Sequence, residues 1–177
     1  MAYGDEPWYF ESTGALLGIL ANTDEADTRH LDLPNPEGKL ILEGRYVNWL
    51  VDSNYVVMID ADKIHFTDEN NWYPRHAKAL LELIESGEQP VFEIPAGRVE
   101  RITKAEVTKT QKEYDNDELE YQRGMVKPWN KSDANTLYAY LLDGNHRALA
   151  AIAAGEPQIP VVVGQNYREN VNRREWI

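Results

Sequence analysis

Five consecutive residues, Asp143-Gly144-Asn145-His146-Arg147, carry the side chains best suited to chemistry in this sequence. An apolar run with strand character precedes them and an alanine-rich run follows, so they should form the turn between a strand and a helix. The free N–H groups and the dipole of a helix N-terminus stabilise a phosphate or a carboxylate. Arg147 could hold a phosphate through two donors, and His146 could donate one more hydrogen bond.

The two residues before this expected helix have separate roles. Gly144 has no Cβ, so the backbone can approach a ligand closely. Asp143 could cap the helix, accept a proton or hold Mg²⁺, which makes it the candidate metal ligand. The competing interpretation is purely structural, because an aspartate before a helix is most often only a cap and a neighbouring histidine only a local hydrogen-bonding group.

Three elements should hold this turn in place. Alternating apolar side chains over residues 136–142 predict a strand, and the small and apolar residues of 145–154 predict a helix that ends at Gly155. The valine-rich segment 159–163 predicts a second strand. Because the helix is apolar around its circumference, it should be buried and should hold its N-terminus rigidly, as a binding site requires.

The first half of the chain contains two further expected strands, at residues 39–49 and 55–59, and a hairpin is their simplest pairing. Gly44, inside the first of them, indicates a possible bulge. Residues 74–86 carry apolar side chains at helical spacing, with a proline at the start and a glycine just past the end, which predicts a helix.

Three other segments are less regular. Residues 90–99 predict a strand that Pro95 bends or places at a sheet edge. Residues 104–123 are either a surface helix or a mobile loop. The short apolar run 14–21 is a buried helix or a strand, since periodicity does not decide between them at that length.

The composition is that of an ordinary globular protein, with 42% hydrophobic and 27% charged residues in a chain of 177 residues. The chain has no cysteine, which excludes disulfides, thiolate zinc sites and cysteine nucleophiles. No apolar stretch approaches the roughly 20 residues that span a bilayer, and the first residues lack a signal-peptide pattern, so we expect a cytoplasmic protein. The net charge of −12 opposes non-specific binding to nucleic acid, and it leaves open a protein that imitates DNA.

The run LLDGNHRALAA at residues 141–151, the glycine that ends its helix and the strand IPVVV at residues 159–163 together resemble the signature of the ParB/sulfiredoxin superfamily. More weakly, residues 91–102 resemble its opening strand and the loop after it, and residues 126–129 resemble a later strand. The resemblance implies an α+β fold with a small mixed sheet and flanking helices. Its nucleotide-binding core would cover residues 90–177, and the preceding residues, 1–89, would be an N-terminal extension or a covering subdomain.

In that superfamily this turn holds the phosphates of ATP, ADP or CTP, often with Mg²⁺. Carried over by the resemblance, Gly144, Asn145, His146 and Arg147 would form the phosphate cradle. Members include ATP-using sulfiredoxins, a free-serine kinase, CTP-switching partition proteins, nucleases and phage DNA-modifying kinases. The sulfiredoxin cysteine is replaced here by Asn145, and the arginine-rich turn of the partition proteins is absent, so the kinase-like branch is the most similar.

A kinase-like reaction needs a general base within hydrogen-bond reach of the acceptor hydroxyl. Glu93 and Glu100, on the strand and turn expected to face the site, are candidates, beside Asp143 and His146 as further catalytic residues. We therefore expect a nucleotide-binding protein that transfers or hydrolyses a phosphate, with an unknown acceptor. Two alternatives stay open: a ParB-like nuclease or DNA-associated protein, and a non-enzymatic acidic interaction protein such as an inhibitor that imitates DNA.

Two other histidines could act as metal ligands. His65 and His76 have aromatic and acidic residues between them, but a metal site usually has tighter, repeated spacing. A turn that flanks the helix beginning at residue 74 is the simpler interpretation.

Overall fold

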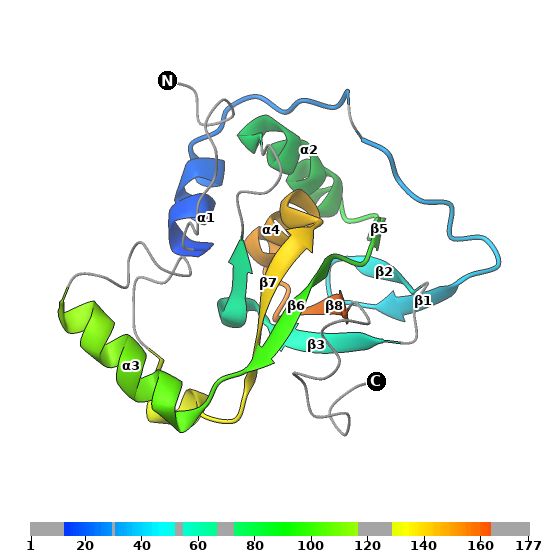
Figure 1. Cartoon of the computed structure of the whole chain (residues 1–177). Coiled ribbons are helices and arrows are strands. Elements are labelled where there is room, and N and C mark those ends of the chain that lie inside the picture. Colours follow the sequence, from blue (N-terminus) through cyan, green and yellow to red (C-terminus); the bar gives the residue numbers. More distant parts are fainter. Residues whose placement is uncertain (1–12, 30, 52–54, 67–72, 117–128, 164–177) are drawn as a thin grey trace.

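The computed structural model describes residues 13–29, 31–51, 55–66, 73–116 and 129–163. Over these ranges the chain forms a mixed α+β fold with four α-helices and two small mixed β-sheets (Figure 1). None of the helices described is long and apolar enough to cross a membrane. Two predicted segments lie partly outside the described residues. They are residues 117–123 of the expected surface helix or loop, and most of the segment 126–129 that resembles a later strand of the superfamily.

The larger sheet has five strands in the order β3-β8-β6-β7-β4. These strands are β3 (Val56–Asp60), β8 (Gln158–Val163), β6 (Ala96–Arg101), β7 (Leu137–Asp143) and β4 (Ile64–Phe66). β7 pairs antiparallel with β6 and parallel with β4, while β8 pairs parallel with β6 and antiparallel with β3. The strand that leads into the predicted turn, β7, therefore has a neighbour on each side.

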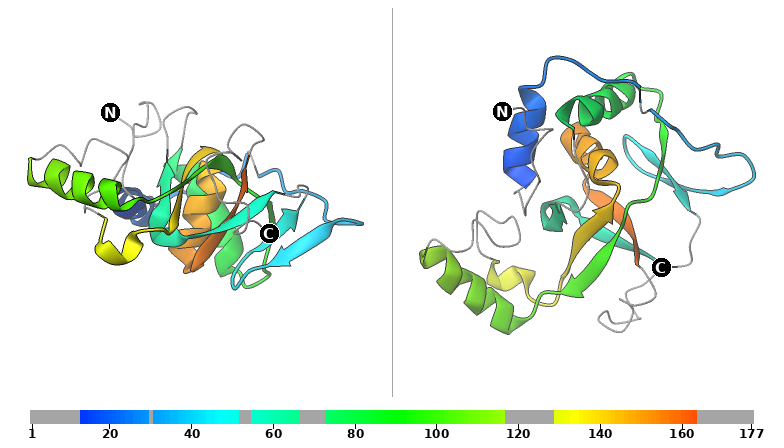
Figure 2. Two further views of the ribbon diagram at one scale, coloured as in Figure 1. Left: turned by 60° about the horizontal axis from the view of Figure 1, so that its bottom comes forward. Right: turned by 45° about the horizontal axis from the view of Figure 1, so that its top comes forward.

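Three helices pack together beside this sheet. α4 (Asn145–Ala154) packs along α2 (Pro74–Glu85), and α1 (Thr13–Ala21) contacts both of them (Figures 1 and 2). Four consecutive side chains of α4 are fully buried: Ala148, Leu149, Ala150 and Ala151. The prediction of a buried helix after the turn is therefore confirmed.

Local helix signals are also confirmed. α2 has a proline in its first turn, and Gly87 follows its end with a φ of 83°. α4 ends at Gly155, whose φ of 107° is a left-handed conformation that favours glycine. Where the sequence left two choices, the apolar run 14–21 belongs to helix α1, and residues 104–115 form helix α3 (Lys104–Asp115).

The smaller sheet corrects one prediction. Its strands are β1 (Leu40–Glu43), β2 (Asn48–Val51) and β5 (Val91–Glu93), with β1 and β2 antiparallel and β2 and β5 parallel. The expected hairpin between residues 39–49 and 55–59 is wrong, because the first of these segments folds back on itself at residues 44–47. β3 pairs instead with β8 in the larger sheet.

A buried carboxylate from far along the chain stabilises this reversal. Glu156, only 4% exposed, accepts hydrogen bonds from the backbone N–H groups of Arg45, Tyr46 and Val47 at 2.8, 2.9 and 3.1 Å. A Cβ on Gly44 would collide with the carbonyl oxygen of Val47. The glycine thus permits a tight turn between β1 and β2, and the carboxylate satisfies the backbone donors of that turn.

Pro95 lies where the chain passes from one sheet to the other. β5 ends at Glu93 in the smaller sheet and β6 begins at Ala96 in the larger one, so the predicted interruption of the strand is confirmed. The Pro95 carbonyl oxygen accepts a hydrogen bond of 2.8 Å from the N–H of Val162 on β8. A residue without an N–H donor is suited to this point, where regular strand pairing stops.

One hydrophobic core joins residues from both sides of residue 90. It includes Trp49, Ile59 and Phe66 from the first half of the chain, and Val99, Leu141, Leu149 and Val161 from the second. β3 and β4 are strands of the same sheet as β6, β7 and β8. In the described residues one core therefore contains residues from both sides of the boundary expected between residues 89 and 90.

Candidate functional site

The predicted turn forms at the junction of β7 and α4. β7 ends at Asp143, Gly144 follows with a φ of 85°, and α4 begins at Asn145. The N-cap residue of α4 is Gly144, which has no side chain that could cap the helix. Asp143 Oδ1 accepts a hydrogen bond of 2.9 Å from the N–H of Gly144. An α-helix leaves its first N–H groups without partners inside the helix, so this end of α4 can offer donors to an anion.

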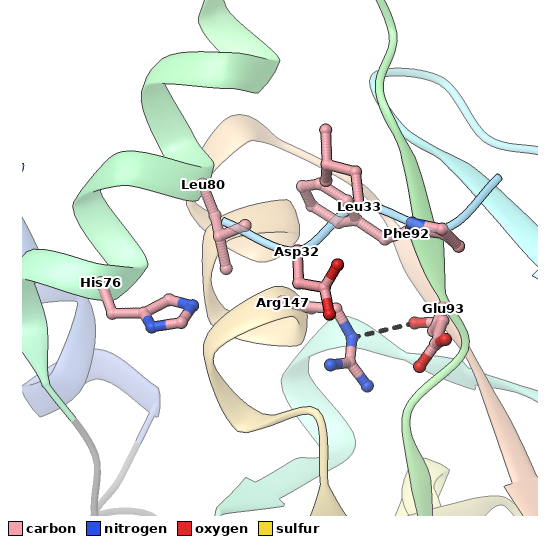
Figure 3. Close-up of a pocket in the computed structure, with 8 residues that line it drawn as sticks. Asp32, Leu33, His76, Leu80, Phe92, Glu93 and Arg147 are labelled. Atoms are coloured by element: carbon pink, nitrogen blue, oxygen red, sulfur yellow. Dashed lines mark hydrogen bonds between the residues drawn. The ribbon is translucent and has the colours of Figure 1, made fainter. Parts of the chain in front are cut away.

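Arg147 is held beside this turn. Its Nε donates a hydrogen bond of 3.0 Å to the carbonyl oxygen of Glu93 on β5, as Figure 3 shows. Its Nη2 lies 3.9 Å from Asp143 Oδ2. A Cβ on Gly144 would lie 2.9 Å from the same Nη2, so the missing side chain leaves room for the guanidinium. The positive charge is therefore held at the start of α4 by contacts with two strands, β5 and β7.

A small pocket opens next to this guanidinium. It has a volume of about 220 Å³ and is lined by Asp32, Leu33 and Pro34 from the segment before β1, His76 and Leu80 from α2, Phe92 and Glu93 from β5, and Arg147 from α4 (Figure 3). Two carboxylates, an imidazole and a guanidinium thus share one cavity with an apolar wall. Of the five residues of the predicted turn, Arg147 alone lines this pocket.

His146 has a different position from the one expected. Its Nε2 accepts a hydrogen bond of 2.8 Å from the N–H of Tyr73, and its ring stacks on His76 with the centroids 4.7 Å apart. Burial first, and then the neighbouring His76 and Arg147, lower the pKa of His146 from 6.5 to about 3. The imidazole is therefore neutral at physiological pH and joins α4 to the residue before α2, which is the structural role that the sequence left open.

Asn145 and Asp143 differ in their exposure to solvent. Asn145 is 3% exposed, and no hydrogen-bond partner of its Oδ1 is found in the described part of the chain. The Asp143 side chain is 74% exposed, so its carboxylate is accessible to a metal ion or a proton. Asp143 is the turn residue that could hold Mg²⁺, and the described residues contain no group of three or more His, Asp and Glu side chains that could hold a metal. A magnesium ion held by Asp143 would have water and oxygens of a bound ligand as its other ligands.

The two candidate glutamates are separated by the structure. Glu93 lines the pocket, and its carbonyl oxygen binds Arg147. Glu100 lies on β6 opposite Tyr138, four residues beyond Ala96, which pairs with Asp143. At about 3.3 Å per strand residue, Glu100 is roughly 13 Å from the turn, because the antiparallel pairing carries it away.

Glu100 instead belongs to an aromatic cluster at the other end of β7. Its Oε2 accepts a hydrogen bond of 2.6 Å from the Tyr138 hydroxyl, and its Oε1 lies 2.9 Å from Nε of Arg98. His65 lies in the same cluster, with its ring 5.2–5.7 Å from those of Trp129, Tyr138 and Tyr140. His65 and His76 are thus in different places and do not share a metal site.

Two residues that line the pocket, Asp32 and His76, were not predicted to lie there. Asp32 comes from a segment without helix or strand periodicity, so no pattern could place it. The sequence indicates His76 only as a possible metal ligand, although its place in the first turn of α2 is a usable signal that it lies near another helix end. Both reach the pocket through tertiary packing of segments that are distant in the sequence.

Substituting Gly144 by alanine should lower the free energy of unfolding by about 1–3 kcal/mol, because a left-handed conformation strains an L side chain. The new Cβ would also lie 2.9 Å from Pro95 Cα and from Arg147 Nη2. Urea denaturation checks the stability. The control is Gly87→Ala, because Gly87 has nearly the same φ, 83°, with no atom within 4 Å of a new Cβ. An equal loss in both variants would contradict the close contact at Gly144.

No protein-family model, curated protein or solved structure matches the chain.

Proposed function

We propose that the protein binds a nucleotide by its phosphates at the start of α4, in a ParB/sulfiredoxin-like fold, and uses it for phosphate transfer or hydrolysis. The observation that carries the proposal is the guanidinium of Arg147, held by the Glu93 carbonyl oxygen beside a helix N-terminus whose N-cap residue, Gly144, has no side chain. Arginine and helix N–H groups together are a common way to bind phosphate. The resemblance of the turn to the superfamily signature supports a nucleotide as the source of that phosphate.

The chemistry of the pocket supports a small polar ligand with an apolar part. Leu33, Leu80 and Phe92 provide apolar surface, and Arg147 provides the positive charge. Mg²⁺ bound to the phosphates would neutralise charge that develops during transfer, and the exposed Asp143 carboxylate is the residue that would hold it. Glu93, which lines the pocket, is the candidate general base, while Glu100 is too distant for that role.

The test is thermal stability with ATP, ADP, CTP and GTP, each with and without Mg²⁺. A nucleotide present at about 100 times its dissociation constant stabilises the folded state by about 2.7 kcal/mol, which gives a visible shift in melting temperature. Arg147→Ala should weaken binding by about 100-fold, since a charge-assisted bidentate contact is lost.

The matched control is Arg45→Ala. Arg45 is an exposed arginine in the turn that Glu156 holds, and Glu156 follows the opposite end of α4, so the same charge is removed away from the site. A shift that is lost in Arg147→Ala and kept in Arg45→Ala supports the site. The proposal fails if no nucleotide shifts the melting temperature, or if both variants respond like the wild type.

A further inference from the structure

The pocket beside Arg147 contains two carboxylates that the fold itself does not use. Asp32 and Glu93 both line it, and both residues are exposed, so a ligand can reach them from solvent. In the described part of the chain neither carboxylate takes part in a hydrogen bond or an ion pair, since Glu93 engages Arg147 through its backbone carbonyl oxygen. Two like charges that share a cavity repel each other, so a bound cation would stabilise them.

The guanidinium of Arg147 does not neutralise this pair. Of the carboxylates in the described residues, only that of Asp143 lies within ion-pair distance of it, 3.9 Å from its Nη2. Figure 3 shows the side chains of Asp32, Glu93 and Arg147 at the same end of the pocket. With Asp143 included, three carboxylates lie near one guanidinium, so this end of the pocket attracts a positive charge.

Much of the remaining wall of the pocket is apolar. Leu33, Leu80 and Phe92 line it, and Leu33 is 44% exposed, which leaves apolar surface for a ligand to cover. At about 220 Å³ the pocket is smaller than the roughly 300–1,000 Å³ of common ligand sites, so it suits a molecule smaller than a nucleotide. A metal ion prefers several oxygen ligands, and the described residues contain no group of three or more His, Asp and Glu side chains that could hold one.

We propose that this pocket binds a small aliphatic primary amine. The ammonium group donates hydrogen bonds to the carboxylates of Asp32 and Glu93, and the alkyl chain lies against the apolar wall. An ammonium group has three donors, so it can serve both carboxylates at once. The ligand has no carboxylate of its own, because a further negative charge would be repelled at this end of the pocket.

This amine is a second ligand, beyond the nucleotide proposed above, since the two carboxylates that anchor it do not bind phosphate. Its binding is measured without nucleotide. A protein that binds the amine and no nucleotide, or a nucleotide and no amine, therefore shows which of the two proposals has failed.

Three matched probes test the charge and the apolar part separately. They are isoamylamine, L-leucine, which is the same molecule with an added carboxylate, and isoamyl alcohol, in which a hydroxyl group replaces the ammonium. Binding is measured by isothermal titration calorimetry with the full-length protein at pH 8, where a primary amine is still protonated. We expect isoamylamine to bind saturably and more weakly as salt is raised, and the other two to bind at least about tenfold more weakly.

Two variants test the carboxylates. Asp32→Asn and Glu93→Gln should each weaken the binding of isoamylamine by about tenfold, because each removes one charged partner and keeps the shape of the side chain. The matched control is Glu37→Gln. It removes the same charge from an exposed glutamate in the segment before β1 that does not line the pocket, and it should leave the binding unchanged.

The proposal is overturned if isoamylamine does not bind, or if Asp32→Asn and Glu93→Gln bind it as well as Glu37→Gln does. Equally tight binding of isoamyl alcohol would also overturn it, since the apolar wall alone would then hold the ligand. Equal or tighter binding of L-leucine would contradict the class of ligand, because Arg147 would then receive the carboxylate of a zwitterion.

Discussion

Substituting Glu156 by alanine should lower the free energy of unfolding by about 3–5 kcal/mol, because three hydrogen bonds to one buried charge are lost together. The carboxylate accepts from the N–H groups of Arg45, Tyr46 and Val47 and is only 4% exposed. Without it, these donors lose their partner in a turn that follows β1 directly. The midpoint of urea denaturation should fall while the dependence on urea concentration stays the same, as for a change of stability alone.

Two further variants separate the hydrogen bonds from the charge. Glu156→Gln keeps the shape and one acceptor oxygen, but its amide group would face backbone donors, so we expect a smaller loss of about 1.5–3 kcal/mol. Glu43→Ala removes an exposed glutamate of the same hairpin and should change stability by no more than about 0.5 kcal/mol. Equal stability of Glu156→Ala and Glu43→Ala would show that the buried carboxylate does not hold this turn.

Acidification should destabilise the protein through His146. Burial, His76 and Arg147 lower the pKa of His146 from 6.5 to about 3 in the folded state. At pH values above 6.5 the imidazole is neutral in both states, and stability is fully present. As the pH falls from 6.5 towards 3, the unfolded chain takes up a proton that the folded protein does not, so stability decreases. At about 1.4 kcal/mol per pH unit, the loss should reach about 2 kcal/mol near pH 5.

The matched variant is His146→Gln, whose side-chain oxygen can still accept the hydrogen bond from the N–H of Tyr73 but does not titrate. The difference in unfolding free energy between the two proteins, measured by urea denaturation at each pH, should change by about 2 kcal/mol between pH 8 and pH 5. Carboxylate titration is common to both proteins and cancels in this difference. Parallel pH profiles would mean that His146 titrates normally in the folded protein.

The neutral His146 also holds the start of α4 in place at the proposed site. His146 joins the start of α4 to Tyr73, which immediately precedes α2, and its ring stacks on His76, which lines the pocket. The helix end that carries Arg147 is therefore fixed by contacts on both of its sides. A ligand that binds there meets a rigid cation, which lowers the ordering cost of binding.

The amino-acid sequence by itself determined the local elements around the site. β7, α4, β8 and α2 occur close to where the sequence predicts them. Alternation marks β7 and helical spacing marks α2, while alanine-rich and valine-rich composition favour the helix α4 and the strand β8. Gly87 and Gly155 end their helices for the local reason that both have a positive φ. The position of the five-residue turn between a strand and a helix is also a local property.

Only the tertiary structure decided which distant groups meet. Glu156 accepts hydrogen bonds in the turn that joins β1 to β2. The register of β6 on β7 carries Glu100 away from the turn, while Glu93 reaches the pocket. Asp32, which also lines the pocket, comes from a segment with no periodicity. Such contacts join residues far apart in the sequence, so they depend on sheet order and helix packing and leave no local pattern. The protonation state of His146 also depends on the tertiary structure, because burial and neighbours that only folding brings to it set its pKa.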